Sequence, residues 1–387
     1  VIMDDPFIYS KFVTGKNFIG RSVESKILEN FIKQGENVYI SEPPKCGKAS
    51  LIQQTFFSMK SSGDRFSTIS ISLLGIRSIR DFALQFGSAL IRSLGETPDD
   101  FSKAAGTYLD GTHFIFDLNQ FNASGSILSL NWDIDDNDLL AIFRLPWRIA
   151  ADRSINTCVI LNEFQNIMLT EDGDHICKLL ETVFKGRQSG QKAVVSYIFI
   201  GSQINAMNYI FGIRRYFYRQ VERVKLGEIE TREIIDHVVR GYLASGKVVD
   251  RDLLLGVCKL FRNNIWYINH FAAICDSLTK GYIMEPALNE ALEVIISIHE
   301  PRFISTMNDL TTYQVNLLHA ILDGNTRFSS ADVIRKYDLS SSANVRRLKD
   351  ALCKKEIVFF DENSNPSVID PLFEYWAGKY FYNINYE

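Results

Sequence analysis

The order of apolar and polar positions divides the chain into three parts. From about residue 18 to residue 226, short apolar runs alternate with segments whose apolar residues recur at helical spacing. This alternation predicts an α/β fold with a parallel sheet covered by helices. The predicted strands are residues 37–41, 67–72, 157–162 and 194–200, with a short fifth strand at 223–226.

The segment 97–137 lies between the second and third predicted strands and is rich in Gly, Asn, Asp and Phe. We expect it to be irregular, apart from a hairpin formed by the apolar runs 114–118 and 126–130. An insert of this length usually has a function or contacts a partner. A decoration that varies between relatives explains it equally well.

The rest of the chain has helical periodicity followed by a mixed pattern. The expected helices of the middle part are residues 231–245, 250–261, 264–279 and 286–298. The last part predicts three helices: one at 313–322, a second that begins with residues 329–334 and a third that begins with residues 341–349. Two wing strands are predicted at 357–360 and 366–369, and together these elements indicate a winged helix. We therefore predict an α/β core at 1–227, a helical domain at 228–305 and a winged-helix domain at 306–387.

Composition limits the function without identifying it. The 387 residues are 46% hydrophobic and 23% charged, as in a folded globular protein, and the net charge of −4 gives no general attraction to nucleic acid or anionic lipid. No apolar run reaches transmembrane length, and the acidic start at residues 1–5 lacks the basic region of a signal peptide. The six cysteines form no C-x-x-C pair and indicate reduced thiols. We expect a cytoplasmic protein without a membrane partner.

The segment 41–51 has the frame of a phosphate-binding P-loop, G-x-x-x-x-G-K-[ST], between a predicted strand and a predicted helix. In such a loop the backbone amides hold the phosphates, the Lys reaches the β- and γ-phosphates, and the Ser/Thr hydroxyl binds Mg²⁺. An ordinary strand–turn–helix containing a Gly-Lys pair is the competing interpretation. The candidate nucleotide-binding residues are Pro43, Pro44, Lys45, Cys46, Gly47, Lys48, Ala49 and Ser50.

Two positions of the motif carry unusual residues. Glu42 replaces the first Gly, so its carboxylate repels phosphate unless it points away or pairs with Lys45. Ala49 replaces the Mg²⁺-binding Ser/Thr, and the neighbouring Ser50 is displaced by about 100° around a helix. We therefore expect weak or Mg²⁺-independent binding of ATP or ADP.

The apolar run 157–162 is typical of a buried parallel strand, and polar residues stand at its carboxyl end. Functional residues of α/β proteins commonly lie at this end of a strand. Asn162 occupies the place of the Asp that holds Mg²⁺, and Glu163 the place of the carboxylate that polarises the attacking water. Glu163 is thus the candidate catalytic residue, and Ser50 and Asn162 are the remaining candidate Mg²⁺ ligands. A plain buried strand with a polar end is the alternative.

The winged-helix part raises the question of DNA binding. Its third helix presents five polar or basic candidates for contacts with DNA. Acidic residues are also frequent in this part, which lacks the basic excess of a DNA footprint. We therefore favour a regulatory or protein-contact role over DNA binding. The candidate DNA contacts are Ser341, Asn344, Arg346, Arg347 and Lys349.

Six segments carry recognisable motifs in order along the chain: FIGRSVE at 18–24, PPKCGKASL at 43–51, NEFQ at 162–165, GSQINAM at 201–207, YR at 218–219 and DPLFEYW at 370–376. Together they resemble the archaeal-type AAA ATPases of the STAND class of P-loop NTPases. The resemblance implies that residues 1–227 form the P-loop core and that the helical domain at 228–305 is the lid that follows it. The departures at Glu42, Ala49 and Asn162 affect the chemistry and leave the predicted fold intact.

The resemblance implies roles for further residues. Ile19, Gly20 and Arg21 would lie near the adenine and ribose, whereas Ser202 or Gln203 would lie near the γ-phosphate. The resemblance also implies that Arg219 reaches a phosphate of its own or a neighbouring subunit. For Arg21 and Arg219, a surface or interdomain salt bridge is an equally good interpretation.

Two functions of different classes remain open at this stage. The first is a nucleotide-dependent switch or scaffold with little hydrolysis, which the retained Lys48 and Glu163 favour. The second is a degenerate ATPase that binds protein or DNA, which Glu42, Ala49 and Asn162 favour. An active hydrolase ranks third. A protein partner is expected, and a monomer and a nucleotide-dependent oligomer are both compatible with the sequence.

Overall fold

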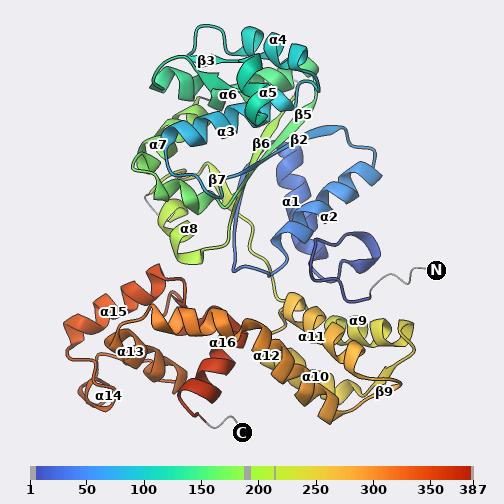
Figure 1. Ribbon diagram of the computed structural model, residues 1–387, viewed down its shortest axis with the longest axis vertical. Helices are drawn as coiled ribbons and strands as arrows, with labels where there is room; N and C mark the ends of the chain where they lie inside the picture. Colours follow the sequence, from blue (N-terminus) through green and yellow to red (C-terminus); the bar gives the residue numbers. More distant parts are fainter. Residues whose placement is uncertain (1–5, 187–192, 213–214, 385–387) are drawn as a thin grey trace. The chain divides into compact units, whose positions relative to one another are not determined.

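The computed structural model describes residues 6–186, 193–212 and 215–384 (Figure 1). The acidic start at residues 1–5 lies outside the described residues. The chain forms two compact units. One contains Val23–Glu42 and Thr55–Leu226, and the other contains Val1–Ser22, Pro43–Gln54 and Gly227–Glu387. No helix in the described part of the chain is long and apolar enough to span a membrane.

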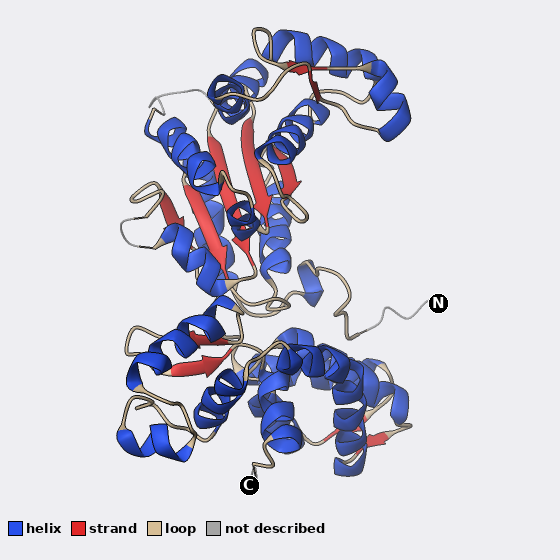
Figure 2. Cartoon of the chain, turned by 60° about the vertical axis from the view of Figure 1, so that its left-hand side comes forward, coloured by secondary structure: helices blue, strands red, loops and turns tan. Residues whose placement is uncertain are grey.

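A five-stranded sheet forms the centre of the first unit (Figure 2). Its strands are β1 (Asn37–Ser41), β2 (Phe66–Ser72), β5 (Asn156–Asn162), β6 (Val195–Gly201) and β7 (Val221–Arg223). They lie in the order β2-β5-β6-β1-β7, and all neighbours are parallel. This is the predicted α/β P-loop fold. The fifth strand begins and ends a few residues earlier than its predicted range, 223–226.

Helices cover both faces of this sheet because its strands are apolar on both sides. On one face lie α1 (Ser22–Gln34) and the end of α2 (Lys48–Ser61). The other face packs against α3 (Ile79–Arg92), α6 (Asp136–Arg153) and α7 (Gly173–Lys185). A 3₁₀ turn (Phe164–Leu169) and α8 (Ile204–Phe211) follow the carboxyl ends of β5 and β6.

The insert is more regular than predicted. Residues expected to be irregular form α4 (Pro98–Tyr108), because Thr97 and Asp100 make a capping box and Pro98 occupies the first helical turn. The predicted hairpin exists as the antiparallel pair of β3 (Phe114–Ile115) and β4 (Ser129–Leu130). Each strand has only two residues, and α5 (Leu118–Ser124) lies between them.

The second unit contains most of the remaining helices. Its N-terminal segment includes a 3₁₀ turn at Gly15–Asn17. The helices that follow the sheet are α9 (Thr231–Ala244), α10 (Arg251–Leu260), α11 (Ile265–Leu278) and α12 (Glu285–Asn308), with a short parallel pair of β8 (Val248–Val249) and β9 (Tyr282–Ile283). The predicted boundary at 305/306 falls inside α12.

The C-terminal part has the winged-helix elements that the sequence predicts. They are α13 (Thr312–Leu322), α14 (Ala331–Lys336), α15 (Ser342–Lys354), the antiparallel strands β10 (Val358–Phe360) and β11 (Pro366–Val368), and α16 (Pro371–Trp376) with a π-helical turn at Ala377–Phe381. One continuous apolar core joins these elements to the helices before them. Phe303 of α12 belongs to it and packs against Phe373 and Trp376.

The shared core predicts that the helices before and after residue 305 unfold together. Phe303 is 1% exposed, so we expect Phe303→Ala to lower the free energy of unfolding of this unit by about 3–5 kcal/mol. The neighbouring Ile304 is 46% exposed, and Ile304→Ala should cost less than about 0.5 kcal/mol. Urea unfolding of both variants, followed by circular dichroism and by proteolysis of the winged helix, measures the difference. Loss of the winged helix alone in Phe303→Ala would contradict a common core.

Candidate functional site

The P-loop joins β1 to α2, as the sequence predicts. Lys48 is the first residue of α2 and is 9% exposed. Its ammonium donates to the carbonyl oxygen of Pro43 at 2.6 Å and lies 3.9 Å from the sulfur of Cys46. The side chain that carries the phosphate-binding charge of the motif therefore points back into the loop that precedes it.

The loop has the glycine geometry of its motif at Gly47. This residue has φ +93°, and a Cβ atom there would lie 2.9 Å from Nη1 of Arg21. Arg21 donates from Nη1 to the carbonyl oxygen of Cys46 at 2.5 Å and from Nε to the carbonyl oxygen of Gly227 at 3.0 Å. Gly47 therefore allows a close approach of Arg21, which fixes the loop backbone by a charge-assisted hydrogen bond.

The residues before Arg21 pack on the start of the helical segment. Gly20 has φ +62°, and a Cβ atom there would lie 2.9 Å from Cγ2 of Ile229. Ile19 is partly buried against the apolar core of the same unit. The predicted role of these three residues near an adenine and ribose remains a prediction, but the structure adds a role in holding the loop.

The N-terminal segment also binds the P-loop helix. The amide of Val13 donates to the hydroxyl oxygen of Ser50 at 3.2 Å, and the amide of Gly15 donates to Oε1 of Gln54 at 2.7 Å. The Ser50 hydroxyl, a candidate Mg²⁺ ligand, is thus already a hydrogen-bond acceptor, while Ala49 is exposed. Sequence reasoning missed the N-terminal segment because backbone donors leave no signature in side-chain identity.

Glu42 is directed toward the end of the sheet. Its Oε1 accepts a hydrogen bond from the amide of Leu226 at 3.3 Å, and its own amide donates to the carbonyl oxygen of Gly201 at 3.4 Å. The carboxylate thereby receives a backbone donor. Lys45, which the sequence offered as one possible partner of Glu42, places its ammonium 3.8 Å from the ring centroid of Trp266.

The carboxyl ends of β5 and β6 bring together three polar side chains. Glu163 has φ +55°, and its Oε2 accepts hydrogen bonds from the Ser202 hydroxyl and from Nε2 of Gln165, at 2.6 Å in the second case. The candidate base and one candidate sensor therefore touch each other. Gln203 is exposed at the start of α8, and Arg219 is exposed with its guanidinium 5.2 Å from the ring of Tyr218.

Asn162, the other candidate Mg²⁺ ligand, is bound across the sheet. Its Nδ2 donates to the hydroxyl oxygen of Ser70 at 2.9 Å and to the carbonyl oxygen of Ile71 at 3.4 Å. An aspartate at this position could accept a hydrogen bond from the Ser70 hydroxyl, but it has no hydrogen to donate to the Ile71 carbonyl. The amide is therefore suited to its neighbours on β2, which gives Asn162 a structural role.

The winged helix leaves few of its candidate DNA contacts available. The Ser341 hydroxyl caps α15 by accepting from the amide of Asn344, and the Asn344 side chain donates to the carbonyl oxygen of Leu339. The Lys349 ammonium lies 4.2 Å from the ring centroid of Phe360. Arg346 and Arg347 are exposed, and no hydrogen bond or ion pair of either side chain is found in the described part of the chain.

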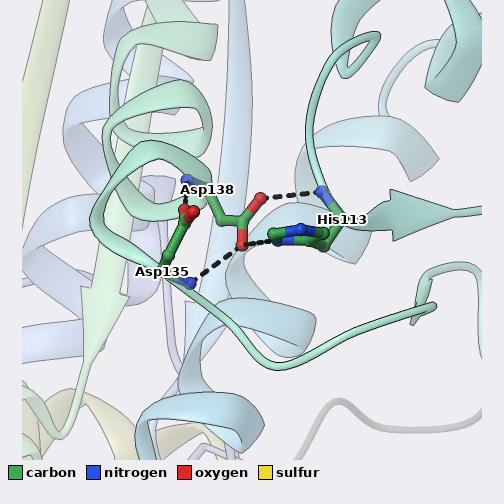
Figure 3. Close-up of side chains that lie close together, drawn as sticks. All are labelled: His113, Asp135 and Asp138. Carbon is green, nitrogen blue, oxygen red and sulfur yellow. Dashed lines mark hydrogen bonds and ion pairs between the residues drawn. The ribbon is translucent and has the colours of Figure 1, made fainter.

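A cluster of His113, Asp135 and Asp138 in the insert has the composition of a metal site, with ligand atoms within 4.8 Å of one another (Figure 3). The Asp138 carboxylate, however, accepts three hydrogen bonds. They come from the backbone amide of His113 at 2.8 Å, from Nδ1 of the His113 ring at 2.9 Å and from the backbone amide of Asp135 at 2.9 Å. Asp135 in turn accepts from the amide of Asp138, completing a capping box. Both oxygens of Asp138 are satisfied by protein donors, so the cluster anchors β3 to the start of α6.

The comparisons with known proteins agree with this architecture. Residues 301–379 match the family model described as "Probable winged helix domain". No curated protein sequence matches the chain.

Solved structures share the whole fold at low sequence identity. The Walker-type ATPase of Pyrococcus abyssi matches with a TM-score of 0.66 and 14% identity, covering 96% of this chain and 99% of the other. The ORC2 protein of Aeropyrum pernix, solved in ADPNP and ADP complexes, matches with a TM-score of 0.57 and 12% identity, covering 92% and 93%. These similarities establish an α/β P-loop NTPase fold followed by helices and a C-terminal winged helix.

The His113–Asp138 pair predicts a pH-dependent contribution to stability. The hydrogen bond to Asp138 raises the pKa of His113 above 6.5. Burial tends to raise the pKa of Asp138, but hydrogen bonds from His113 and Asp135 prevail and lower it below 3.8. The His113 contribution is complete below pH 6.5 and is lost as the pH rises through the raised pKa. The Asp138 contribution is complete above pH 3.8 and is lost as the pH falls through the lowered pKa.

We therefore expect Asp138→Asn to cost about 1–3 kcal/mol near pH 5, because hydrogen bonds to a buried carboxylate are lost. The cost should decrease toward pH 8 and toward pH 3. Asp110→Asn, at an exposed position in the same insert, is the control and should have little effect at any pH. Urea unfolding across this pH range measures both variants. An effect of Asp138→Asn that does not vary with pH would show that the His113–Asp138 pair is not charged in the folded protein.

Proposed function

We propose that this chain binds ATP or ADP through its P-loop and works as a nucleotide-dependent switch or scaffold with little or no hydrolysis. The observation that carries the proposal is the position of Lys48, whose ammonium lies 2.6 Å from the Pro43 carbonyl within a strand–loop–helix of P-loop form. A phosphate oxygen is a stronger acceptor for an ammonium than a neutral carbonyl, so phosphate can replace this internal contact.

Two further observations support nucleotide binding. Arg21 and the N-terminal segment hold the loop through backbone hydrogen bonds, and preorganisation of this kind lowers the cost of binding. The Glu42 carboxylate accepts from the Leu226 amide, which offsets part of its repulsion of phosphate. Among proteins of similar fold, the ORC2 protein of Aeropyrum pernix is described in complexes with ADPNP and ADP.

Slow turnover follows from the groups that an ATPase uses for chemistry. Ala49 has no hydroxyl, the Ser50 hydroxyl already accepts from the Val13 amide, and the Asn162 amide carries no charge to offset Mg²⁺, all of which support weak Mg²⁺ binding. The Glu163 carboxylate already accepts hydrogen bonds from Ser202 and Gln165, so a water molecule would have to compete with these two donors for the same oxygen. A role in signalling or scaffolding, as in the STAND-class proteins that the sequence resembles, fits a bound nucleotide that is rarely hydrolysed.

The alternative is an interaction module that has lost its nucleotide. We do not favour DNA as its partner, because Ser341, Asn344 and Lys349 have local roles in the winged helix. A protein partner fits both interpretations. The nucleotide measurement therefore separates them directly.

Calorimetric titration with ADP, in EDTA and in Mg²⁺, tests the proposal. We expect wild-type binding in EDTA, with little gain from Mg²⁺. Lys48→Met should weaken binding about 10- to 150-fold, because one charge-assisted hydrogen bond to phosphate contributes about 1.5–3 kcal/mol. Lys60→Met, at the other, exposed end of α2, is the matched control and should bind as the wild type does.

Two results would count against a nucleotide switch. If the folded wild type bound neither ADP nor ATP, the chain would be an interaction module. If Lys48→Met and Lys60→Met bound equally well, nucleotide would be held elsewhere than the P-loop.

A further inference from the structure

The P-loop has a second lysine whose surroundings the motif does not explain. Lys45 has φ +62°, and its ammonium lies 3.8 Å from the ring centroid of Trp266 in α11. A cation at this distance from an aromatic face is attracted by the ring quadrupole. This contact between two side chains joins the P-loop to α11.

The charges near Lys45 do not favour its present position. Arg302 is close enough to repel the ammonium, and Asp370, the nearby carboxylate, already binds Arg302 at 2.8 Å and the hydroxyl of Tyr267 at 2.9 Å. Burial first, and then Arg302, lowers the pKa of Lys45. No ion pair is found for Lys45 among residues 6–186, 193–212 and 215–384. Asp370 attracts the ammonium, but the repulsion by Arg302 is larger, so the Trp266 ring is an attraction that these charges do not supply.

Trp266 is held by an aromatic cluster that extends across the unit. Its ring meets Tyr9 edge-on at 5.9 Å, His270 at 5.3 Å and His299 of α12 at 5.8 Å. His270 stacks on Tyr9 at 4.3 Å. A displacement of Trp266 would therefore change its contacts with the N-terminal segment, with α11 and with α12.

The centre of this cluster has unused hydrogen-bonding capacity. His270 and His299 are 8% and 9% exposed, and Nδ1 of His270 and Nε2 of His299 have no hydrogen-bond partner in the described part of the chain. Buried polar atoms without partners destabilise the arrangement that contains them. The observed packing therefore leaves two buried nitrogen atoms without hydrogen bonds, and this lowers the free energy needed to rearrange the aromatic cluster.

We propose that Lys45 has two positions, on the Trp266 ring when no phosphate is bound and on a nucleotide phosphate when one is. Nucleotide binding then removes the contact between the P-loop and α11 and releases Trp266. The proposal rests on the proposed function, and it identifies how the bound state would be transmitted to the helical segment. Phosphate prevails over the ring because a charge-assisted hydrogen bond is stronger than a cation–π contact.

Fluorine NMR of the full chain labelled with 5-fluorotryptophan tests the proposal. The chain has four tryptophans, and Trp266→Phe assigns one resonance to Trp266. In the wild type, saturation with ADP in EDTA should shift this resonance. Lys45→Met should shift it in the same direction without ADP, and ADP should then add little. Unchanged resonances of the other three tryptophans show that the variant is folded.

Lys336→Met is the matched control, because the Lys336 ammonium lies 4.7 Å from the ring of Tyr337 in the winged helix, away from the loop. It should leave the Trp266 resonance and its response to ADP unchanged. The proposal is overturned if ADP binds by calorimetry while the Trp266 resonance stays still, or if Lys45→Met responds to ADP as the wild type does. In both cases nucleotide binding itself stands. Absence of ADP binding to the wild type would overturn the proposed function as well.

Discussion

The function of the P-loop depends on the contacts that hold it, two from the N-terminal segment and one within the loop itself. Arg21 donates to the Cys46 carbonyl, the Val13 amide donates to the Ser50 hydroxyl, and Lys48 donates to the Pro43 carbonyl. Each contact satisfies a polar group that would otherwise need water or a ligand. A phosphate would compete with the contact of Lys48, whereas the contacts of Arg21 and Val13 preorganise the loop for binding.

This competition explains how a P-loop that departs from the motif of an active ATPase can still serve as a nucleotide-dependent switch. An ATPase needs Mg²⁺ and a general base, and here Ala49 lacks the hydroxyl, Asn162 lacks the charge, and the Glu163 carboxylate already binds two side chains. A switch needs only a difference in affinity between two arrangements of the protein. Lys48 and Lys45 can provide such a difference, since the Lys48 ammonium binds a neutral carbonyl, the Lys45 ammonium lies on an aromatic ring, and a phosphate attracts both more strongly.

The sequence predicted the architecture well because the architecture follows from apolar periodicity and strand order. The predicted strands at 37–41 and 157–162 coincide with β1 and β5 to within one residue. The sequence predicted the insert less well, because α4 carries few apolar residues and its main signal is the capping box of Thr97 and Asp100, which apolar periodicity does not reveal. The sequence could not reveal contacts made by backbone groups, such as Val13 with Ser50, or between distant side chains, such as Lys45 with Trp266. Such contacts depend on three-dimensional placement, which periodicity does not encode.

A bound nucleotide is expected to replace two contacts of the P-loop, that of Lys48 with the Pro43 carbonyl and that of Lys45 with the Trp266 ring. Amide hydrogen exchange of the full chain, with and without saturating ADP in EDTA, measures this replacement. We predict slower exchange in residues 43–51 and faster exchange at the start of α11 around Trp266, where the contact with Lys45 is released. Unchanged exchange in both segments, with ADP shown to be bound, would contradict it.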